Sequence, residues 1–336
     1  MKILVFDNEK IYRLYHQGAV PSHWLYGVAE FEQAGHTIVN HERNGNAITR
    51  LLDDVRAVRK HKPDAIFFPF FNIRCHPLLL LLAALRIVRK PVYGVVHRTP
   101  PKSQVTRLLL RGITQAFFLS PRNRQQSVAL GLLPDRKTQD ASWGPDLAFY
   151  DRHIRKREQK GYFIATGKEN RDYDLLINVF ASRTEPLLIH TCHAHAGNHY
   201  DYLEGAAADH ANIRTIISEN SGANFLTMLH EMADAKALLC PLQMAKIRYC
   251  VGLSTIADAM ALGLPVVLTE NPYHPIDVNR EGIGFAVKTS EEWSRAIDKL
   301  SDNQTAEDIG RRSRKLAEER YNIDLFARQI MNCFEK

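Results

Sequence analysis

Short hydrophobic runs alternate with longer amphipathic segments along almost the whole chain. In the first half, β-branched and aromatic residues predict strands over 2–6, 37–41, 65–71, 91–97 and 116–120. Helical periodicity predicts helices over 23–35, 48–62, 77–90, 103–112 and 122–130. Nearly continuous apolar strands separated by helices indicate a parallel sheet that is covered on both faces.

The same alternation restarts in the second half. Strands are predicted over 162–166, 186–190, 213–217, 237–242, 265–269 and 284–287. Helices are predicted over 174–181, 224–233, 254–262, 291–300 and 307–320. A pause at Trp-Gly-Pro-Asp (143–146) and the charged stretch 151–160 mark the boundary between them.

We therefore predict an α/β protein with two doubly wound, Rossmann-like domains, residues 1–150 and 151–320. Residues 321–336 are expected to form a final helix that packs back on the first domain. A ligand cleft is expected between the carboxyl ends of the two sheets, where folds of this kind bind ligands.

The length and composition agree with this organisation. A chain of 336 residues, 45% hydrophobic and 24% charged, exceeds one hydrophobic core and is typical of globular proteins. Its five cysteines are scattered, which favours a reducing compartment over a disulfide framework. The most apolar run, 77–85, is too short to span a bilayer, and no signal peptide is evident. A cytoplasmic location is the expectation.

Charge is distributed unevenly between the two halves. Residues 1–150 contain 21 Lys and Arg against 11 Asp and Glu, a balance of +10. Residues 151–336 contain 23 against 26, a balance of −3, which gives the net charge of +7. A basic first half suits an anionic partner such as the inner face of a membrane, although a solvated basic surface without a role has the same composition.

The stretch GYFIATGKEN (161–170) approximates the phosphate-binding P-loop motif G-x-x-x-x-G-K-[ST]. Five residues rather than four separate Gly161 from Gly167, and Glu169 stands where a magnesium-binding Ser or Thr belongs. The intervening residues favour a strand, whose amides alternate in direction and cannot converge on one anion. The triphosphatase interpretation is therefore rejected.

The second half of this stretch still favours a phosphate site. Gly167 ends the predicted strand, and Lys168 and Arg171 follow in a polar loop before a helix. Two cations at the carboxyl end of a strand suit a diphosphate. The alternative is a pair of solvated loop charges.

A second candidate is YCVGLSTIADAMALGLPVVLTEN (249–271). Gly252 and Leu253 permit a tight loop, and Ser254 and Thr255 open a helix whose free amides and positive dipole end suit a phosphate. Asp258, one turn later, could accept hydrogen bonds from a ribose diol. The alternative is a simple helix cap formed by Thr255 and Asp258.

The order of these motifs resembles that of retaining GT-B glycosyltransferases, especially the large family-four group. PSHWLYGVAEFEQAGHTIV (21–39) and WGPDLAFY (143–150) resemble amino-terminal segments of that group, so the resemblance covers nearly the whole chain. It implies the GT-B fold and transfer of a sugar, with retained configuration, from a UDP- or GDP-sugar. No metal or other cofactor is implied. The expected acceptor is a glycan or glycolipid, as in surface polysaccharide biosynthesis.

The resemblance also implies roles for individual residues. Lys168 and Arg171 would neutralise the departing diphosphate. Asp258 takes the place of a glutamate that holds the ribose, and Ser254 and Thr255 that of amides that meet phosphate. His97, at the end of the strand 91–97, resembles a histidine that faces the sugar. By itself His97 would be interpreted as a polar residue at a strand end.

The chain departs from the family in two places. The cation pair of the family is usually an arginine with a lysine five positions later, unlike Lys168 and Arg171. The family often has two glutamates eight positions apart, where this chain has Cys250 and Asp258. Because the first glutamate usually touches the donor sugar, another contact from 243–252 is expected, with Lys246, Arg248 and Tyr249 as candidates. An inactive nucleotide-binding protein and a nucleotide-sugar 2-epimerase are the alternative functions.

Residues 190–200, HTCHAHAGNHY, contain four histidines. Only His195 and His199 have helical i, i+4 spacing, and Gly197-Asn198 between them favours a loop. We therefore expect no metal site there. Nucleic-acid binding is also disfavoured, because the basic residues show no interleaved aromatic motif.

Overall fold

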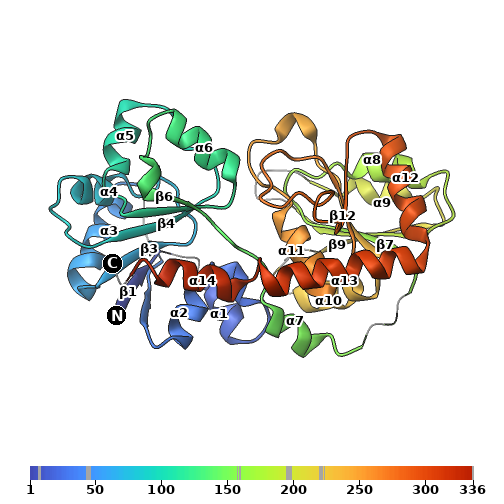
Figure 1. Ribbon diagram of the computed structural model, residues 1–336, viewed down its shortest axis with the longest axis horizontal. Coiled ribbons are helices and arrows are strands. Elements are labelled where there is room, and N and C mark those ends of the chain that lie inside the picture. Colours follow the sequence, from blue (N-terminus) through green and yellow to red (C-terminus); the bar gives the residue numbers. More distant parts are fainter. Residues whose placement is uncertain are drawn as a thin grey trace. The chain divides into compact units, whose positions relative to one another are not determined.

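The computed structural model describes residues 1–6, 9–42, 47–156, 158, 160–193, 199–218, 222 and 224–334. They form two compact units (Figure 1). Unit 1 comprises Met1–Gln17, Ser22–Trp143 and Ile323–Lys336, and unit 2 comprises Gly18–Pro21 and Gly144–Asn322. The chain therefore passes from unit 1 to unit 2 between Trp143 and Gly144, inside the Trp-Gly-Pro-Asp stretch, and it returns to unit 1 at Ile323.

Unit 1 contains a parallel six-stranded sheet in the order β2-β1-β3-β4-β5-β6. The strands are β1 (Lys2–Val5), β2 (Thr37–Asn40), β3 (Ala65–Phe68), β4 (Val92–Val96), β5 (Gln115–Phe118) and β6 (Thr138–Asp140). The first five were predicted. The sequence did not predict β6, because Thr-Gln-Asp is a polar three-residue edge strand without hydrophobic periodicity.

Helices cover both faces of this sheet. They are α1 (Glu9–His16), α2 (Val28–Gln33), α3 (Ala47–His61), α4 (Pro77–Ala84), α5 (Gln104–Leu110), α6 (Pro121–Ala129) and α14 (Ile323–Met331), with short 3-10 turns at Ser22–Leu25 and Asp135–Lys137. One face packs side chains of α3, α4 and α5. On the other, Phe31 of α2 contacts Phe67, and Phe334 after α14 contacts Phe31 and Tyr93.

The predicted single helix over 23–35 is wrong. A 3-10 turn ends at Leu25, and α2 begins only at Val28. Between them Tyr26 and Gly27 have φ of 51° and 94°, in the left-handed region that no α-helix contains. The hydrophobic period continues across this break, so the sequence pattern alone did not reveal it.

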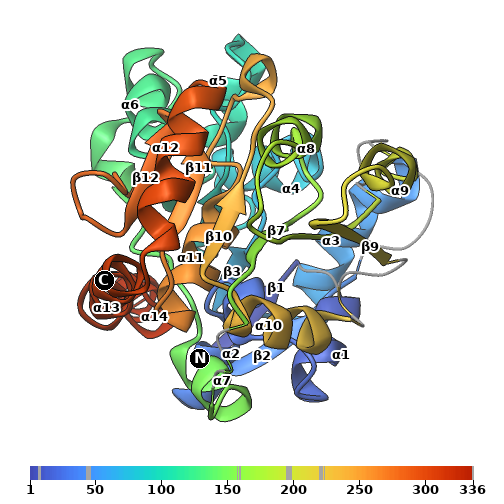
Figure 2. The same ribbon diagram turned by 90° about the vertical axis from the view of Figure 1, so that its right-hand side faces the viewer.

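Unit 2 contains a second parallel sheet in the order β12-β11-β10-β7-β8-β9 (Figure 2). Its strands are β7 (Phe163–Thr166), β8 (Leu187–Cys192), β9 (Ile213–Ser218), β10 (Ala237–Cys240), β11 (Val266–Thr269) and β12 (Gly284–Val287). All six were predicted. The chain starts at the centre with β7, moves outward to β9, and returns to β10 on the other side of β7. The topological switch point therefore lies between β7 and β10.

The helices of unit 2 are α7 (Leu147–His153), α8 (Tyr173–Phe180), α9 (Tyr202–Ala207), α10 (Phe225–Asp234), α11 (Leu253–Leu262), α12 (Ser290–Ser301) and α13 (Asn303–Glu319), with a 3-10 turn at Met244–Lys246. Side chains of α8, α9 and α12 share one core with one face of the sheet, where Trp293 is fully buried. Helices α10 and α11 cover the other face (Figure 2). Among the described residues, no helix has both the length and the hydrophobicity needed to cross a membrane.

Candidate active site

The two predicted phosphate motifs meet in unit 2 at the switch point between β7 and β10. The loop after β7 and the loop after β10 are joined by a bridge between Arg171 and Leu242. The amide of Gln243 donates to the carbonyl of Asn170 at 3.1 Å, and its side chain donates to the carbonyl of Arg171 at 3.0 Å. Doubly wound sheets bind ligands at this position because the helices on either side diverge there.

The strand predicted in the first half of the stretch 161–170 is confirmed. Residues Phe163–Thr166 form β7, which pairs with β8 on one side and β10 on the other. The amides of a paired central strand are engaged with its neighbours and cannot wrap a phosphate. The resemblance of residues 161–170 to the motif is therefore limited to Gly167 and Lys168.

Arg171 is the best-defined charge of the site, with only 3% of its surface exposed. Its Nε donates to the carbonyl of Thr166 at 2.9 Å, and Nη1 donates to the carbonyl of Glu169 at 2.8 Å. Nη2 donates to Oγ1 of Thr255 at 3.2 Å, which links the two predicted motifs directly. Gly167, with φ of 96°, makes room for it, since a Cβ there would lie 2.2 Å from Nη2.

The guanidinium of Arg171 has no acidic partner among the described residues, because its hydrogen bonds run to two carbonyls and one hydroxyl. An unpaired buried charge costs several kcal/mol of desolvation. Of the five N–H groups of an arginine, three are used by the protein. Asp258 interacts with this charge electrostatically but lies beyond ion-pair distance, so an anion at the loop would be the first direct acidic partner of Arg171 among the described residues.

Hydroxyl groups from three other elements hold the Gly167–Lys168 loop. Tyr173 at the start of α8 donates to the carbonyl of Gly167, and Thr191 of β8 donates to the same carbonyl at 2.8 Å. Tyr200 donates to the carbonyl of Lys168 at 2.7 Å. The loop is therefore fixed before any ligand binds. Sequence reasoning missed these three residues, because isolated hydroxyls carry no motif.

Helix α11 begins at Leu253 without a side-chain cap. Its N-cap is Gly252, with φ of 90° and so little space that a Cβ would lie 2.8 Å from Sγ of Cys240. The capping alternative for Thr255 and Asp258 is therefore wrong, since both residues lie inside the helix. Ser254 is exposed in the first turn, whereas the neighbouring amides of Leu253 and Thr255 already donate to the carbonyls of Cys250 and Gly252 at 3.1 Å. An uncapped helix start is suited to an anion.

Asp258 is buried, and the hydroxyl of Tyr150 donates to its Oδ1. Burial raises the pKa of Asp258 to about 7, although the Tyr150 hydrogen bond and the charge of Arg171 act in the opposite direction. Tyr150 belongs to α7, in the segment 143–150 that carries part of the family resemblance but to which no site role was given. The ribose contact of Asp258 stays a prediction, with one carboxylate oxygen already engaged.

Two residues outside the predicted site fix the loop before α11. The side-chain amide of Asn271 donates to the carbonyls of Tyr249 and Val251 at 3.0 and 3.1 Å. Nε2 of His274 lies 2.8 Å from the same Val251 carbonyl. Burial lowers the pKa of His274 to about 4, so its ring is neutral and donates this hydrogen bond.

In unit 1, His97 follows the carboxyl end of β4 and is buried. Its Nε2 lies 3.4 Å from the carbonyl of Pro69, and its ring contacts Phe70 and Tyr26 at centroid distances of 4.1 and 5.0 Å. Burial lowers the pKa of His97 to about 4. The imidazole is therefore neutral at physiological pH, and its orientation is set by the two aromatic rings.

The histidine-rich segment divides into two environments. His190 in β8 is buried, with Nδ1 bonded to Glu231 of α10 and Nε2 lying 2.7 Å from Oγ of Ser218. Both ring nitrogens are thus engaged inside the protein. The predicted i, i+4 pair cannot be assessed, because His195 lies outside the described residues.

His193, His199 and Asp201 place one ligand atom each within 4.8 Å of one another. However, the backbone amide of Tyr200 donates to Nδ1 of His193 at 3.4 Å, which places the ring proton on Nε2. That Nε2 lies 3.3 Å from Asp201, where a hydrogen bond explains the contact. No metal role is assigned to these residues.

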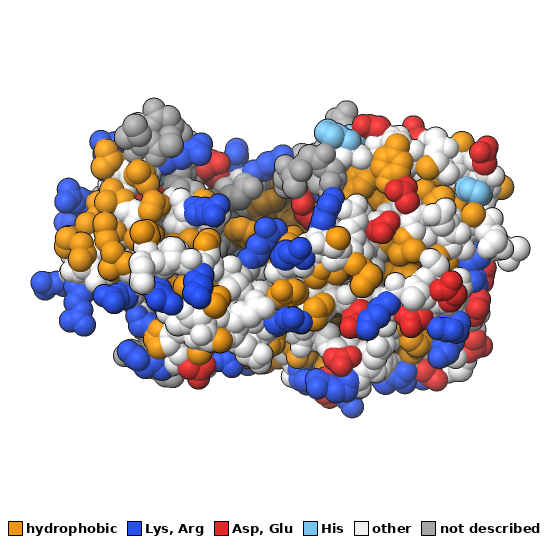
Figure 3. Space-filling view, turned by 90° about the horizontal axis from the view of Figure 1, so that it is seen from above, with side chains coloured by type: hydrophobic (Ala, Val, Ile, Leu, Met, Phe, Trp, Pro, Cys, Tyr) orange, Lys and Arg blue, Asp and Glu red, His pale blue; other side chains and the backbone are white. Residues whose placement is uncertain are grey.

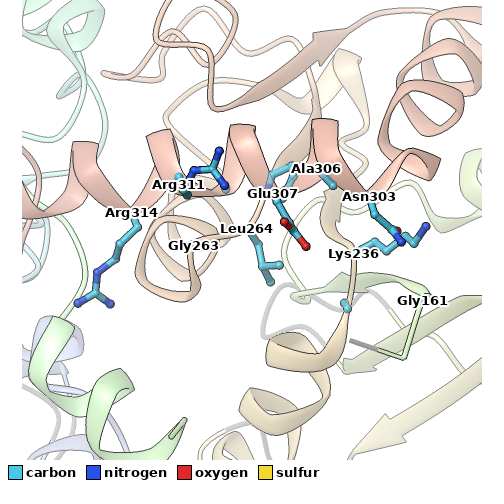
Figure 4. A pocket seen from close by; sticks show the side chains of 12 residues that line it. Gly161, Lys236, Gly263, Leu264, Asn303, Ala306, Glu307, Arg311 and Arg314 are labelled. Atoms are coloured by element: carbon cyan, nitrogen blue, oxygen red, sulfur yellow. The ribbon is translucent and has the colours of Figure 1, made fainter. Parts of the chain in front are cut away.

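A separate pocket of about 620 Å³ lies at the amino ends of the strands of unit 2, away from the carboxyl ends that form the candidate site (Figure 4). Gly161, Lys236 and Pro265, which precede β7, β10 and β11, line it together with residues of α13 such as Glu307 and Arg311. Because ligands of doubly wound sheets bind at the carboxyl ends of the strands, this pocket is not assigned to the site.

No family model matches the sequence, and no curated protein matches it. Solved structures do resemble it across both units. WaaG, a glycosyltransferase involved in lipopolysaccharide biosynthesis, is 12% identical, with 99% of this chain and 98% of that chain covered and a TM-score of 0.61. A UDP-forming α,α-trehalose-phosphate synthase from Burkholderia vietnamiensis is 10% identical, with 87% and 77% covered and a TM-score of 0.61.

A UDP-N-acetylglucosamine 2-epimerase is also similar, at 10% identity, with 95% of this chain and 94% of that chain covered and a TM-score of 0.54. At such identities these similarities establish the fold alone. Together with the two six-stranded parallel sheets, they confirm the predicted GT-B architecture.

Proposed function

We propose that this protein is a glycosyltransferase that moves a sugar from a UDP- or GDP-sugar to a glycan or glycolipid acceptor, with retained anomeric configuration. The observation that carries the proposal is Arg171, a buried guanidinium at the switch point of the sheet that makes no direct ion pair with a described carboxylate. A diphosphate bound beside it supplies the missing negative charge.

The chemical role of Arg171 follows from its burial. In a retaining transfer the sugar–phosphate bond breaks and the nucleoside diphosphate leaves with additional negative charge. A guanidinium about 6 Å from a phosphate, at an effective dielectric of about 20, stabilises each phosphate charge by about 3 kcal/mol. Because Arg171 is held by three hydrogen bonds, it does not reorganise during the reaction.

The other predicted residues complete the proposed donor site. Lys168 is half-buried on the loop next to Arg171, so its ammonium group could reach the diphosphate directly. In the first turn of α11 the amide of Ser254 would donate to the same group, and Thr255 would position Arg171 through its hydroxyl. Asp258 would hold the ribose. In unit 1 the neutral imidazole of His97 would face the transferred sugar.

We also propose that the acceptor is attached to a membrane surface. Unit 1 exposes an apolar patch of Leu85, Ile87, Val105 and Leu108, on and after helices α4 and α5, which pack together. Lys and Arg side chains surround hydrophobic ones on this part of unit 1 (Figure 3). Next to the apolar residues in the sequence, four cations are exposed: Arg86, Arg89, Lys90 and Lys102. Such a combination suits an anionic membrane, with WaaG, named for lipopolysaccharide biosynthesis, as a structural parallel.

A 2-epimerase acting on a nucleotide sugar is the second candidate, favoured by the solved epimerase of similar fold. An epimerase changes the donor sugar when no acceptor is present, whereas a transferase requires an acceptor. Incubating each bound donor alone and separating the products by anion-exchange chromatography distinguishes the two activities.

The proposal is tested first by binding. Differential scanning fluorimetry with UDP, GDP, ADP, dTDP and their sugar derivatives should show a specific rise in the melting temperature with UDP or GDP. The same nucleotide should protect Arg171→Met far less. If no nucleoside diphosphate stabilises the folded protein, the proposed function is wrong.

A further inference from the structure

The loop after β10 carries positive charge shortly before Cys250, the position at which the retaining GT-B family often has a glutamate. No Asp or Glu occurs between Asp234 and Asp258, and Lys246 and Arg248 lie in the middle of this interval. Both side chains are exposed. The hydrogen bond of the Arg248 side chain runs to the carbonyl of Ile247, and no described carboxylate pairs with either cation.

Both ends of this loop are anchored to the donor site. At its start, Leu242 and Gln243 are bonded to residues 170–171 of the Arg171 loop. At its end, Asn271 and His274 hold the carbonyls of residues 249–251, directly before α11. The segment 244–249 therefore starts beside the Arg171 loop and ends beside the start of α11, the two elements proposed to hold the diphosphate.

The residue at the position of the first family glutamate cannot replace that carboxylate. Cys250 is buried with only 5% exposed, and a thiol is a much weaker acceptor for sugar hydroxyls than a carboxylate. The ionic groups that this loop presents to solvent are instead Lys246 and Arg248. A loop whose exposed charges are all positive favours a negatively charged sugar over a neutral one, by charge-assisted hydrogen bonds.

We propose that the donor is a nucleotide-linked uronic acid, whose sugar carboxylate is bound by Lys246 and Arg248. This inference rests on the proposed function, because it assigns the sugar of the same donor site. The carboxylate is expected on the donor rather than on the acceptor, since the loop joins the two elements that hold the donor diphosphate.

The test compares matched donors that differ only at C6 of the sugar. Isothermal titration calorimetry with UDP-glucuronate against UDP-glucose, and with GDP-mannuronate against GDP-mannose, should give about tenfold or tighter binding of the uronate. Lys246→Met/Arg248→Met should abolish this preference while leaving the affinity for the free nucleoside diphosphate within about twofold. Lys246→Arg should retain the preference.

The matched control is Arg311→Met/Lys315→Met, which removes the same two charges from exposed positions on α13 and should keep the preference. Lys246→Glu/Arg248→Glu should reverse it toward the neutral sugar, which tests the charge independently of side-chain packing.

Equal affinity for uronate and hexose in the unmodified protein overturns the inference. It leaves the proposed function intact as long as UDP or GDP binds. If neither nucleotide binds, both the inference and the proposed function fail. A preference that survives in Lys246→Met/Arg248→Met, with both proteins folded by circular dichroism, also overturns the inference.

Discussion

Replacing Arg171 by methionine tests the central charge of the site. Methionine fills a similar volume but removes the guanidinium and its three donors to Thr166, Glu169 and Thr255. Loss of the hydrogen bonds destabilises the protein, whereas removal of the buried charge, with its cost of desolvation, stabilises it. These terms are of similar size, so the free energy of unfolding without ligand should change by no more than about 2 kcal/mol.

Binding of the nucleoside diphosphate should change much more. Counting only the nearer phosphate charge, at about 3 kcal/mol, Arg171→Met should weaken binding of UDP or GDP at least about 100-fold, and Arg171→Lys, which keeps the charge, should weaken it less. Binding of UMP or GMP should weaken less than that of the diphosphate. Isothermal titration calorimetry measures each affinity, and circular dichroism confirms that the variants are folded.

Salt dependence separates Arg171 from its neighbour Lys168. Arg171 is buried, so its contribution should persist between about 50 and about 300 mM salt, whereas that of the half-buried Lys168 should decrease. A folded Arg171→Met variant that binds the diphosphate as tightly as the unmodified protein would refute the reasoning.

Three further predictions follow from the site. Asp258→Asn should leave the free energy of unfolding nearly unchanged at pH 4 and raise it by up to about 4 kcal/mol at pH 8, as measured by urea unfolding. The reason is the raised pKa of Asp258: the protonated carboxyl group stabilises the fold fully below the unfolded pKa, and this stabilisation is lost as pH rises through about 7. An unchanged difference across that pH range would contradict the burial argument. Gly252→Ala should cost about 1–3 kcal/mol because of its positive φ and the close Cys240 sulfur, and Cys240→Ala in the same chain should restore only the steric part. EDTA should leave nucleotide binding and sugar transfer unchanged, and loss of either that added Zn²⁺ or Mg²⁺ restores would show a metal requirement.

The hydrophobic pattern predicted the architecture closely, because a strand buried on both faces must be continuously apolar. The runs at 65–71 and 237–242, for example, became β3 and β10. The pattern failed where local geometry rather than burial decides the structure. The positive φ at Tyr26 breaks a helix that the period alone continues, and the polar strand β6 forms only because β5 offers an unpaired edge.

The sequence also selected Gly167, Arg171 and Gly252 as candidate site residues, since glycines and cations at strand ends carry a recognisable signal. It could not show that Arg171 is buried and bonded to Thr255, because those residues are far apart in the chain and meet only through the pairing of β7 with β10. Nor could the sequence show that Tyr150 contacts Asp258 or that His274 contacts the carbonyl of Val251. Their contacts exist only after distant helices and loops pack together, so the tertiary structure alone decides whether each of these side chains meets a ligand or the protein itself.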